Sequence, residues 1–184
     1  SVMTMRPAAF IAILLASTPG LVRADAIVVT RAMTASTIAE FYVEEDSIHA
    51  ELEIGIVDLP AFRNLLPDEL YERFGYDPQP FPKRLMRFFG EDLLIRADNG
   101  PPLTGWIAEI EGRRRISRDE ITGEPLPPTG EEEEIVVAVR LTYPLSRRPA
   151  SITLTPPGGG RPQATIGFVL YHRGLPVNDF RYLS

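Results

Sequence analysis

Hydrophobic and polar residues alternate over residues 36–59 and predict a β-hairpin there. Two alternating runs flank a polar turn at residues 45–47. Successive side chains of a strand point to opposite faces of a sheet. The second run therefore has an apolar row, which we expect in the core, consisting of Ile48, Ala50, Leu52, Ile54 and Ile56. The opposite row consists of His49, Glu51 and Glu53, and we expect it to face solvent.

Short apolar runs separated by proline, glycine and polar turns favour strands along most of the chain. These further strands are predicted at residues 26–34, 92–98, 103–114, 131–145, 150–157, 164–174 and 177–184. A helical insertion is predicted at about residues 60–90, where Pro60 and Pro67 suit first helical turns and Gly75 suits a C-terminal stop. We therefore predict a mainly β fold, an antiparallel, Ig-like β-sandwich of seven to eight strands with this short helical insertion.

The N-terminal pattern predicts a secretory signal peptide over residues 1–24. Arg6 supplies a positive charge, residues 8–16 form a short apolar run, and Val22 and Ala24 mark a small-residue cleavage site. The apolar run is about half of the roughly 20 residues that span a bilayer, and an uncleaved anchor is the alternative. Residues 25–184 then form a single domain that is exported to the periplasm or another extracytoplasmic compartment.

Composition and charge exclude several classes of function. The chain contains no cysteine, which excludes thiol nucleophiles, thiolate metal sites and dithiol redox motifs. The formal net charge is −6, and removal of Arg6 and Arg23 with the signal peptide makes it two units more negative. An acidic domain does not suit nucleic acid or anionic lipid, so we expect neither nucleic-acid binding nor direct lipid binding by the mature domain. The expected partner is a protein or the chain's own membrane domain.

One row of side chains is a candidate metal site. His49, Glu51 and Glu53 lie on one face of the predicted strand, and nitrogen and carboxylate ligands of this kind bind hard or borderline divalent metals. Alternate residues on a strand are about 6.5–7 Å apart, so a further ligand from a neighbouring strand is needed. The other histidine, His172, is the candidate for that ligand. Otherwise the row is the acidic solvent face of a hairpin, and we expect no cofactor apart from such a metal.

The remaining motifs give weak signals of chemistry. Residues 131–134 are four consecutive glutamates, but they lack the spacing of an EF-hand calcium loop. His172 could act as a catalytic base that Asp179 orients, with Ser or Thr elsewhere as nucleophile, yet no G-x-S-x-G nucleophile elbow accompanies them. Arg113 begins an arginine-rich run that suits either an anion site or a solvated hairpin end. These patterns predict that the protein is not an enzyme.

The order of segments resembles a known family. The stretches "VEEDSIHAELEIGIVDLPAF", "FFGEDLLIRADNGPPLTG" and "VRLTYPL", after a signal peptide and before a final strand pair, look like the N-terminal extracytoplasmic β-domain of HupE/UreJ-like membrane proteins. That group is associated with hydrogenase and urease accessory function. Its nickel-handling residues lie in membrane helices, so the resemblance implies a soluble appendage and assigns no metal ligand to this chain.

Together these observations predict a non-catalytic, exported binding or interaction domain, the N-terminal soluble part of a membrane-associated protein. Two alternatives stay open. One is a metal-handling accessory domain of a HupE/UreJ-like transporter that uses His49 with Glu51 or Glu53. The other is a secreted hydrolase.

Overall fold

The computed structural model describes residues 35–117, 119, 124–127 and 134–155, and the strands at 11–14, 166–172, 175–176 and 182–183. The predicted signal peptide therefore lies outside the described residues, except for the short strand β1 (Ile11–Leu14). The strand predicted at 26–34 also lies outside them. Among the helices of the described residues, none combines the length and the apolar character needed to cross a membrane.

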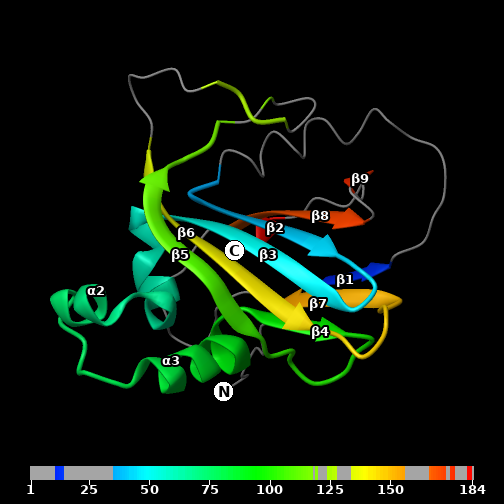
Figure 1. The fold of residues 1–184 in the computed structure, drawn as a ribbon, viewed down its shortest axis with the longest axis horizontal. Coiled ribbons are helices and arrows are strands. Elements are labelled where there is room, and N and C mark those ends of the chain that lie inside the picture. The colour runs from blue at the N-terminus through cyan, green and yellow to red at the C-terminus, as the bar shows by residue number, and fades with distance from the viewer. Residues whose placement is uncertain are drawn as a thin grey trace, which may run out of the picture.

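Five strands form the main sheet, in the spatial order β8-β2-β3-β6-β5 (Figure 1). Their bounds are Thr37–Val43 for β2, Ser47–Gly55 for β3, Trp106–Arg114 for β5, Ile135–Pro144 for β6 and Ile166–His172 for β8. Two short strands, β9 (Leu175–Pro176) and β10 (Tyr182–Leu183), pair with β8. The predicted hairpin is present as β2 and β3, which pair antiparallel around the turn at residues 44–46.

A smaller sheet has the order β1-β7-β4, where β7 is Ser151–Thr155 and β4 is Leu94–Ala97. Both pairs in this sheet are antiparallel. Asp98 and Asn99 follow β4 with φ angles of 50° and 57°. Their left-handed backbone suits a tight turn, in which Asp98 accepts hydrogen bonds from the main-chain N–H groups of Ala150 and Ser151 at 2.8 and 3.0 Å. This carboxylate therefore fixes the start of β7 beside the end of β4.

The helical insertion lies between β3 and β4. It consists of the 3-10 helix η1 (Ile56–Leu65), the helices α2 (Asp68–Arg73) and α3 (Phe81–Arg87), and the π-helical turn η2 (Phe88–Asp92). Pro67 precedes α2, and Gly75 follows it with a φ of +85°, the conformation that glycine adopts most readily. Arg84 of α3 is fully buried and donates a hydrogen bond to the carbonyl of Leu66 at 2.7 Å, which ties α3 to the end of η1.

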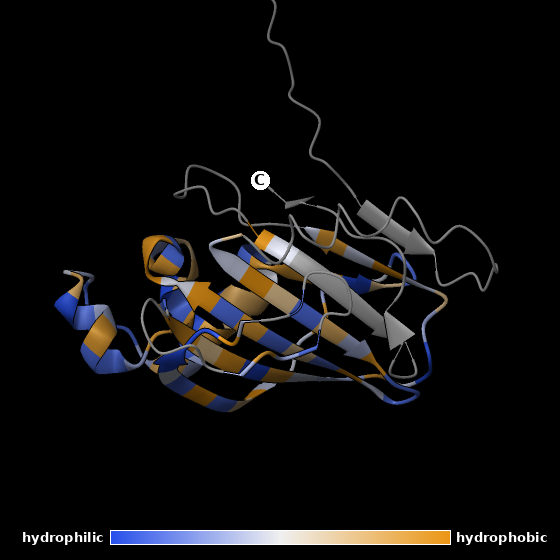
Figure 2. Ribbon diagram, turned by 90° about the horizontal axis from the view of Figure 1, so that it is seen from above, coloured by the Kyte–Doolittle hydropathy of each residue, from blue (hydrophilic) through white to orange (hydrophobic). Residues whose placement is uncertain are grey.

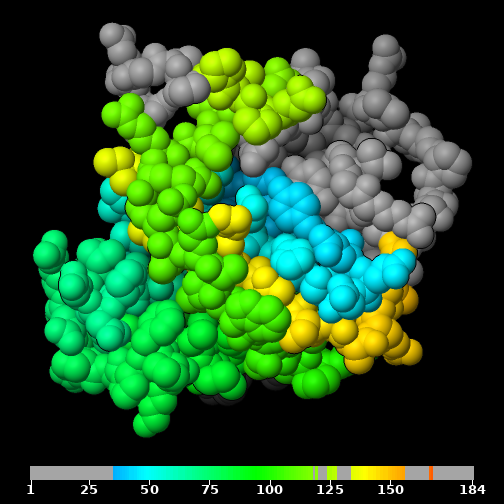
Figure 3. Space-filling model, viewed as in Figure 1, coloured from blue at the N-terminus to red at the C-terminus, as the bar shows by residue number. Residues whose placement is uncertain are grey.

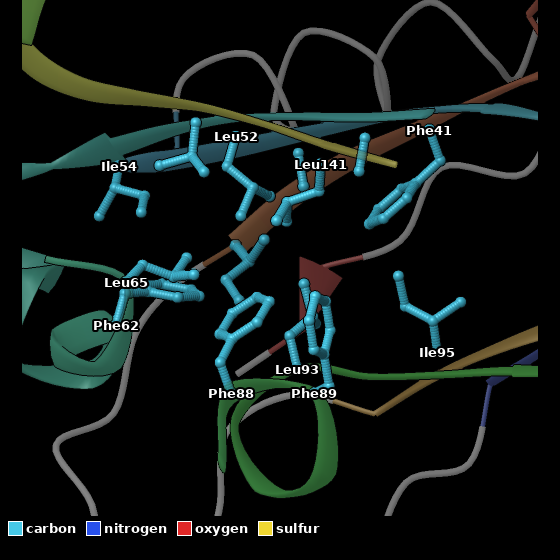
Figure 4. Close-up of a cluster of buried hydrophobic side chains, with 14 of the residues drawn as sticks. Phe41, Leu52, Ile54, Phe62, Leu65, Phe88, Phe89, Leu93, Ile95 and Leu141 are labelled. Atoms are coloured by element: carbon cyan, nitrogen blue, oxygen red, sulfur yellow. The ribbon is translucent and has the colours of Figure 1, made fainter. Parts of the chain in front are cut away.

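The hydrophobic core lies between one face of the main sheet and a layer made of the helical insertion and β4 (Figure 4). Phe41, Leu52, Ile54 and Leu141 point into it from the sheet, and Phe62, Leu65, Phe88, Phe89, Leu93 and Ile95 point into it from the opposite layer. Polar and apolar residues alternate along the strands of the main sheet (Figure 2). The alternation of β3 thus produces the buried apolar row that the sequence predicts, from Ile48 to Ile54.

Two parts of the sequence interpretation need correction. The fold is mainly β, but the main sheet is mixed because β2 and β8 pair in parallel, so an antiparallel, Ig-like sandwich of seven to eight strands is not confirmed. The parallel pair joins segments that are far apart in sequence, and strand patterns alone do not encode such partners. Ile56 also leaves the apolar row, because the chain turns into η1 at this residue and its side chain is 55% exposed.

Candidate functional site on the outer sheet face

The outer face of the main sheet, opposite the core, carries an ordered set of charged residues. The strand register aligns one row across β2, β3, β6 and β5, consisting of Glu40, Glu51, Arg140 and Glu109. The row on one side consists of Ile38, Glu53, Ala138 and Glu111. The row on the other side consists of Tyr42, His49, Thr142 and Trp106. The register therefore brings His49, Glu51 and Glu53 to one face, as the sequence predicts.

Glu53 is not in solvent, which corrects the expectation for this residue. It is 4% exposed, and the end of β5 and the segment after it both contact its carboxylate. Arg113 donates a hydrogen bond to its Oε2 atom at 3.0 Å, and the main-chain N–H of Ile116 donates to the same atom at 3.2 Å. A buried carboxylate with two donors is a structural anchor for this part of the sheet.

Glu40 is also buried on this face, at 2% exposure. The hydroxyl of Tyr42, two residues along β2, donates a hydrogen bond to its Oε2 atom at 2.9 Å. Because Glu40 lies opposite Glu51 in the register, two carboxylates come from adjacent strands at the centre of the face. Like charges in such a pair repel each other and favour a positive charge nearby.

A recess of about 190 Å³ opens beside Glu51. Its charged lining consists of Glu51, Glu109, Glu111, Arg113 and Arg140. Arg140 is paired with Glu109, and Arg113 is shared between Glu53 and Glu111, from which its Nε atom lies 3.5 Å. Both arginines of the recess therefore already have acidic partners.

Glu51 differs from the other acids of the recess. Its side chain is half-buried, and among the residues that the structure describes it has neither a hydrogen bond nor an ion-pair partner. The lining of the recess thus contains three carboxylates and two arginines. The carboxylate of Glu51 is the one without a partner among the described residues. This arrangement favours a positively charged ligand group next to Glu51.

His49 lies on the same face, but its ring already has neighbours. Its Nδ1 atom is 3.2 Å from the hydroxyl of Thr142, and its Nε2 atom is 3.3 Å from the hydroxyl of Ser47 and 3.5 Å from the carboxylate of Glu44. A metal would have to displace one of these partners. In this structure the ring of His49 is therefore a polar link between β3 and β6.

The register separates His172 from the predicted metal row. His172 aligns with Val43 of β2, which aligns with Ile48 of β3, whereas His49 belongs to the neighbouring row with Tyr42. Two strand spacings of about 4.8 Å also separate β8 from β3. Over the described part of the chain, no group of three or more His, Asp or Glu side chains is arranged to hold a metal ion. The four candidate ligands are thus not brought together, and metal binding stays a prediction.

The other candidates from the sequence lie largely elsewhere. Asp179 and residues 131–133 fall outside the described residues. Glu134, the last glutamate of that run, accepts a hydrogen bond from the Nε atom of Arg115 at 3.1 Å, which makes it part of an ion pair.

A buried polar cluster at the start of the main sheet was missed by the sequence analysis. The carboxylate of Asp58 accepts hydrogen bonds from the hydroxyls of Ser36 and Thr37, and the guanidinium of Arg115 donates to the main-chain carbonyl of Ser36. Thr37 in turn accepts from the main-chain N–H of Gly55 at 3.3 Å. These hydrogen bonds join β2, η1 and the segment after β5, while the Nη1 atom of Arg115 is buried without a hydrogen-bond partner in the described structure.

Among the described residues, Tyr143 of β6 has a strongly shifted pKa. Its side chain is fully buried against Phe89, and burial raises the pKa of its hydroxyl far above the ordinary value. The hydroxyl has no hydrogen-bond partner in the described structure. A buried phenol of this kind stays protonated and does not serve as an acid or base near neutral pH.

Comparison with family models, with curated proteins and with solved structures found no match for this chain.

Proposed function

We propose that the chain is a non-catalytic exported binding domain, the N-terminal soluble part of a membrane-associated protein, whose ligand is a basic side chain of a protein partner. The observation that carries this proposal is the half-buried carboxylate of Glu51, which has no partner within the described residues and lines a recess with two other acids. A partly desolvated carboxylate is stabilised when a cation approaches it. Export is supported by the predicted signal peptide at residues 1–24.

The size of the recess supports a single side chain as the ligand. Its volume of about 190 Å³ is below the roughly 300–1,000 Å³ that small-molecule sites occupy. A guanidinium or ammonium group fits such a space, and the planar guanidinium could contact Glu51 and a neighbouring carboxylate together. The negative charge of the chain also favours a basic partner, because it accelerates encounter with opposite charge.

The metal-handling alternative has less support. It needs His49 with Glu51 or Glu53, but His49 is within contact distance of Thr142, Ser47 and Glu44, and Glu53 is held by Arg113. Only Glu51 of that set is available without displacing a partner.

The test is a calorimetric titration of residues 25–184 with short peptides rich in arginine, in lysine or in glutamate. We expect binding of the basic peptides, weakened by salt because the contact is partly exposed. Loss of one charge-assisted hydrogen bond in Glu51→Gln should weaken binding by roughly 10- to 100-fold.

Glu69→Gln is the matched control. It makes the same charge change at an exposed position of α2, away from the recess, and should leave binding unchanged. Equal effects of Glu51→Gln and Glu69→Gln, or no binding of any basic peptide, would contradict the proposal.

A further inference from the structure

The strand β5 forms one edge of the main sheet. It is nine residues long, pairs with β6 on one side, and has no strand on its other side among the described residues. In Figure 1 it is the outermost strand next to β6, and in Figure 3 its side chains lie on the molecular surface. Long exposed edges are a template for pairing with another chain, so proteins either protect them or use them.

The direction of the main-chain groups along this edge follows from one hydrogen bond. The N–H of Arg115 donates to the carbonyl of Glu134 at 2.8 Å, which places residue 115 in the ladder toward β6. Hydrogen bonding alternates along an antiparallel strand, so residues 113 and 111 also bond toward β6. Ile110 and Gly112 therefore direct their N–H and C=O groups away from β6, toward the open edge.

The charges of this edge are arranged in two blocks of opposite sign. Glu109 and Glu111 precede Gly112, and Arg113 and Arg114 follow it. A single-sign edge repels a second copy of itself, which is a common protection against pairing. This edge instead complements itself. If two copies pair antiparallel about an axis at Gly112, each Glu111 lies opposite Arg113 of the partner subunit.

Gly112 suits the axis of such a pair. Added bulk at this residue would meet no heavy atom within 4 Å, so the space beside it is open. Glycine within a strand weakens it unless another backbone approaches closely, and the absent side chain permits that approach. The irregular register between Ile107 and Glu109 ends the regular ladder just before this segment, so residues 109–114 form its regular part.

We propose that β5 is the interface of a two-fold symmetric dimer, in which two copies of the chain pair antiparallel about Gly112 and join their main sheets. Main-chain hydrogen bonds form between the two Gly112 residues, and between Ile110 of each copy and residue 114 of the other copy. These reciprocal pairs supply on the order of six hydrogen bonds. The cross-strand pairs of Glu111 with Arg113 of the partner subunit set the register. The two outer faces are then continuous, with a recess beside Glu51 on each side of the axis.

The first test is sedimentation equilibrium of the full chain. We expect a concentration-dependent shift from 20.5 kDa toward twice that mass. Gly112→Pro should abolish the shift, because it removes an outward N–H without removing a bond to β6. Glu111→Arg should abolish it by placing arginine opposite arginine, whereas Glu69→Arg on α2 should not. A monomer at every soluble concentration, or an unchanged dimer in Gly112→Pro, would overturn the proposal.

A second test does not depend on the stability of the variants. The chain contains no cysteine, so Gly112→Cys introduces a single thiol at the proposed axis. Opposed residues of a hydrogen-bonded pair have Cα atoms about 5.5 Å apart, within the range that a disulfide bridges. Mild oxidation should therefore convert Gly112→Cys to a covalent dimer and leave Gly90→Cys, which is exposed in η2, as a monomer. Equal cross-linking of both variants would contradict the dimer, and neither result depends on ligand binding at Glu51.

Discussion

Arg84 is predicted to hold the helical insertion together, although it is a charged residue in the interior. Its side chain is 0% exposed. It donates to the carbonyls of Leu66 at 2.7 Å and Gln79 at 3.2 Å, and its guanidinium lies 4.3 Å from the ring centre of Tyr71. Replacement by methionine keeps most of the apolar stem but removes every donor.

The loss of stability expected for Arg84→Met follows from these contacts. The buried hydrogen bond from the charged guanidinium to Leu66 is worth about 1.5–3 kcal/mol, and its carbonyl is left without this donor. The hydrogen bond to Gln79 is only partly buried and therefore stabilises less. The ion pair with Asp68 contributes little, because the side chain of Asp68 is largely exposed to solvent. Contact of the methionine sulfur with Tyr71 offsets part of the lost cation–π energy. We therefore expect Arg84→Met to lower the free energy of unfolding by about 3 kcal/mol.

Urea denaturation followed by circular dichroism measures this change. The midpoint should fall while the slope stays the same, since the fold itself is unchanged. Arg87→Met is the control on the same helix, because Arg87 is exposed and its replacement should change stability by less than about 0.5 kcal/mol. Arg84→Lys should fall between the two, because lysine keeps the charge but lacks the planar fork. Equal stabilities of Arg84→Met and Arg87→Met would show that the buried contacts of Arg84 do not stabilise the fold.

Two further predictions concern the buried and exposed polar groups, and a third concerns the predicted signal peptide. Tyr143→Phe should raise the free energy of unfolding by about 1 kcal/mol, because it removes a buried hydroxyl that has no partner in the described structure; a loss of stability would reveal a hydrogen bond to that hydroxyl. Glu53→Ala should cost about 2–3 kcal/mol in urea denaturation, and Glu51→Ala less than about 0.5 kcal/mol, because only Glu53 has buried donors; equal costs would contradict this division. Mass spectrometry of the exported protein should find Asp25 at its N-terminus, and an intact residue 1–24 segment would contradict the predicted cleavage.

The sequence predicts the local structure better than the long-range pairing. Alternation from Ile48 to Ile54 correctly predicts the hairpin and its core face, and proline and glycine correctly indicate a helical region near residues 60–90. Both signals act over a few residues. The parallel partner of β2 is β8, more than a hundred residues later, and no local pattern specifies that choice.

The candidate site was predicted in part for the same reason. The side of the sheet on which Glu51 and Glu53 lie follows from their spacing. Their different burial does not, because it depends on Arg113, which lies 60 residues beyond Glu53 in sequence. Arg84 gave no signal either, since a basic residue in a short helix is ordinarily a solvent-exposed one.

The most direct test of the proposed function is the affinity of residues 25–184 for an arginine-rich peptide, compared between Glu51→Gln and Glu69→Gln. We expect Glu51→Gln to weaken binding by roughly 10- to 100-fold and Glu69→Gln to bind like the unaltered protein. Equal affinities for the two variants, at the same salt concentration and with both correctly folded, would contradict the assignment of the outer sheet face as the binding surface.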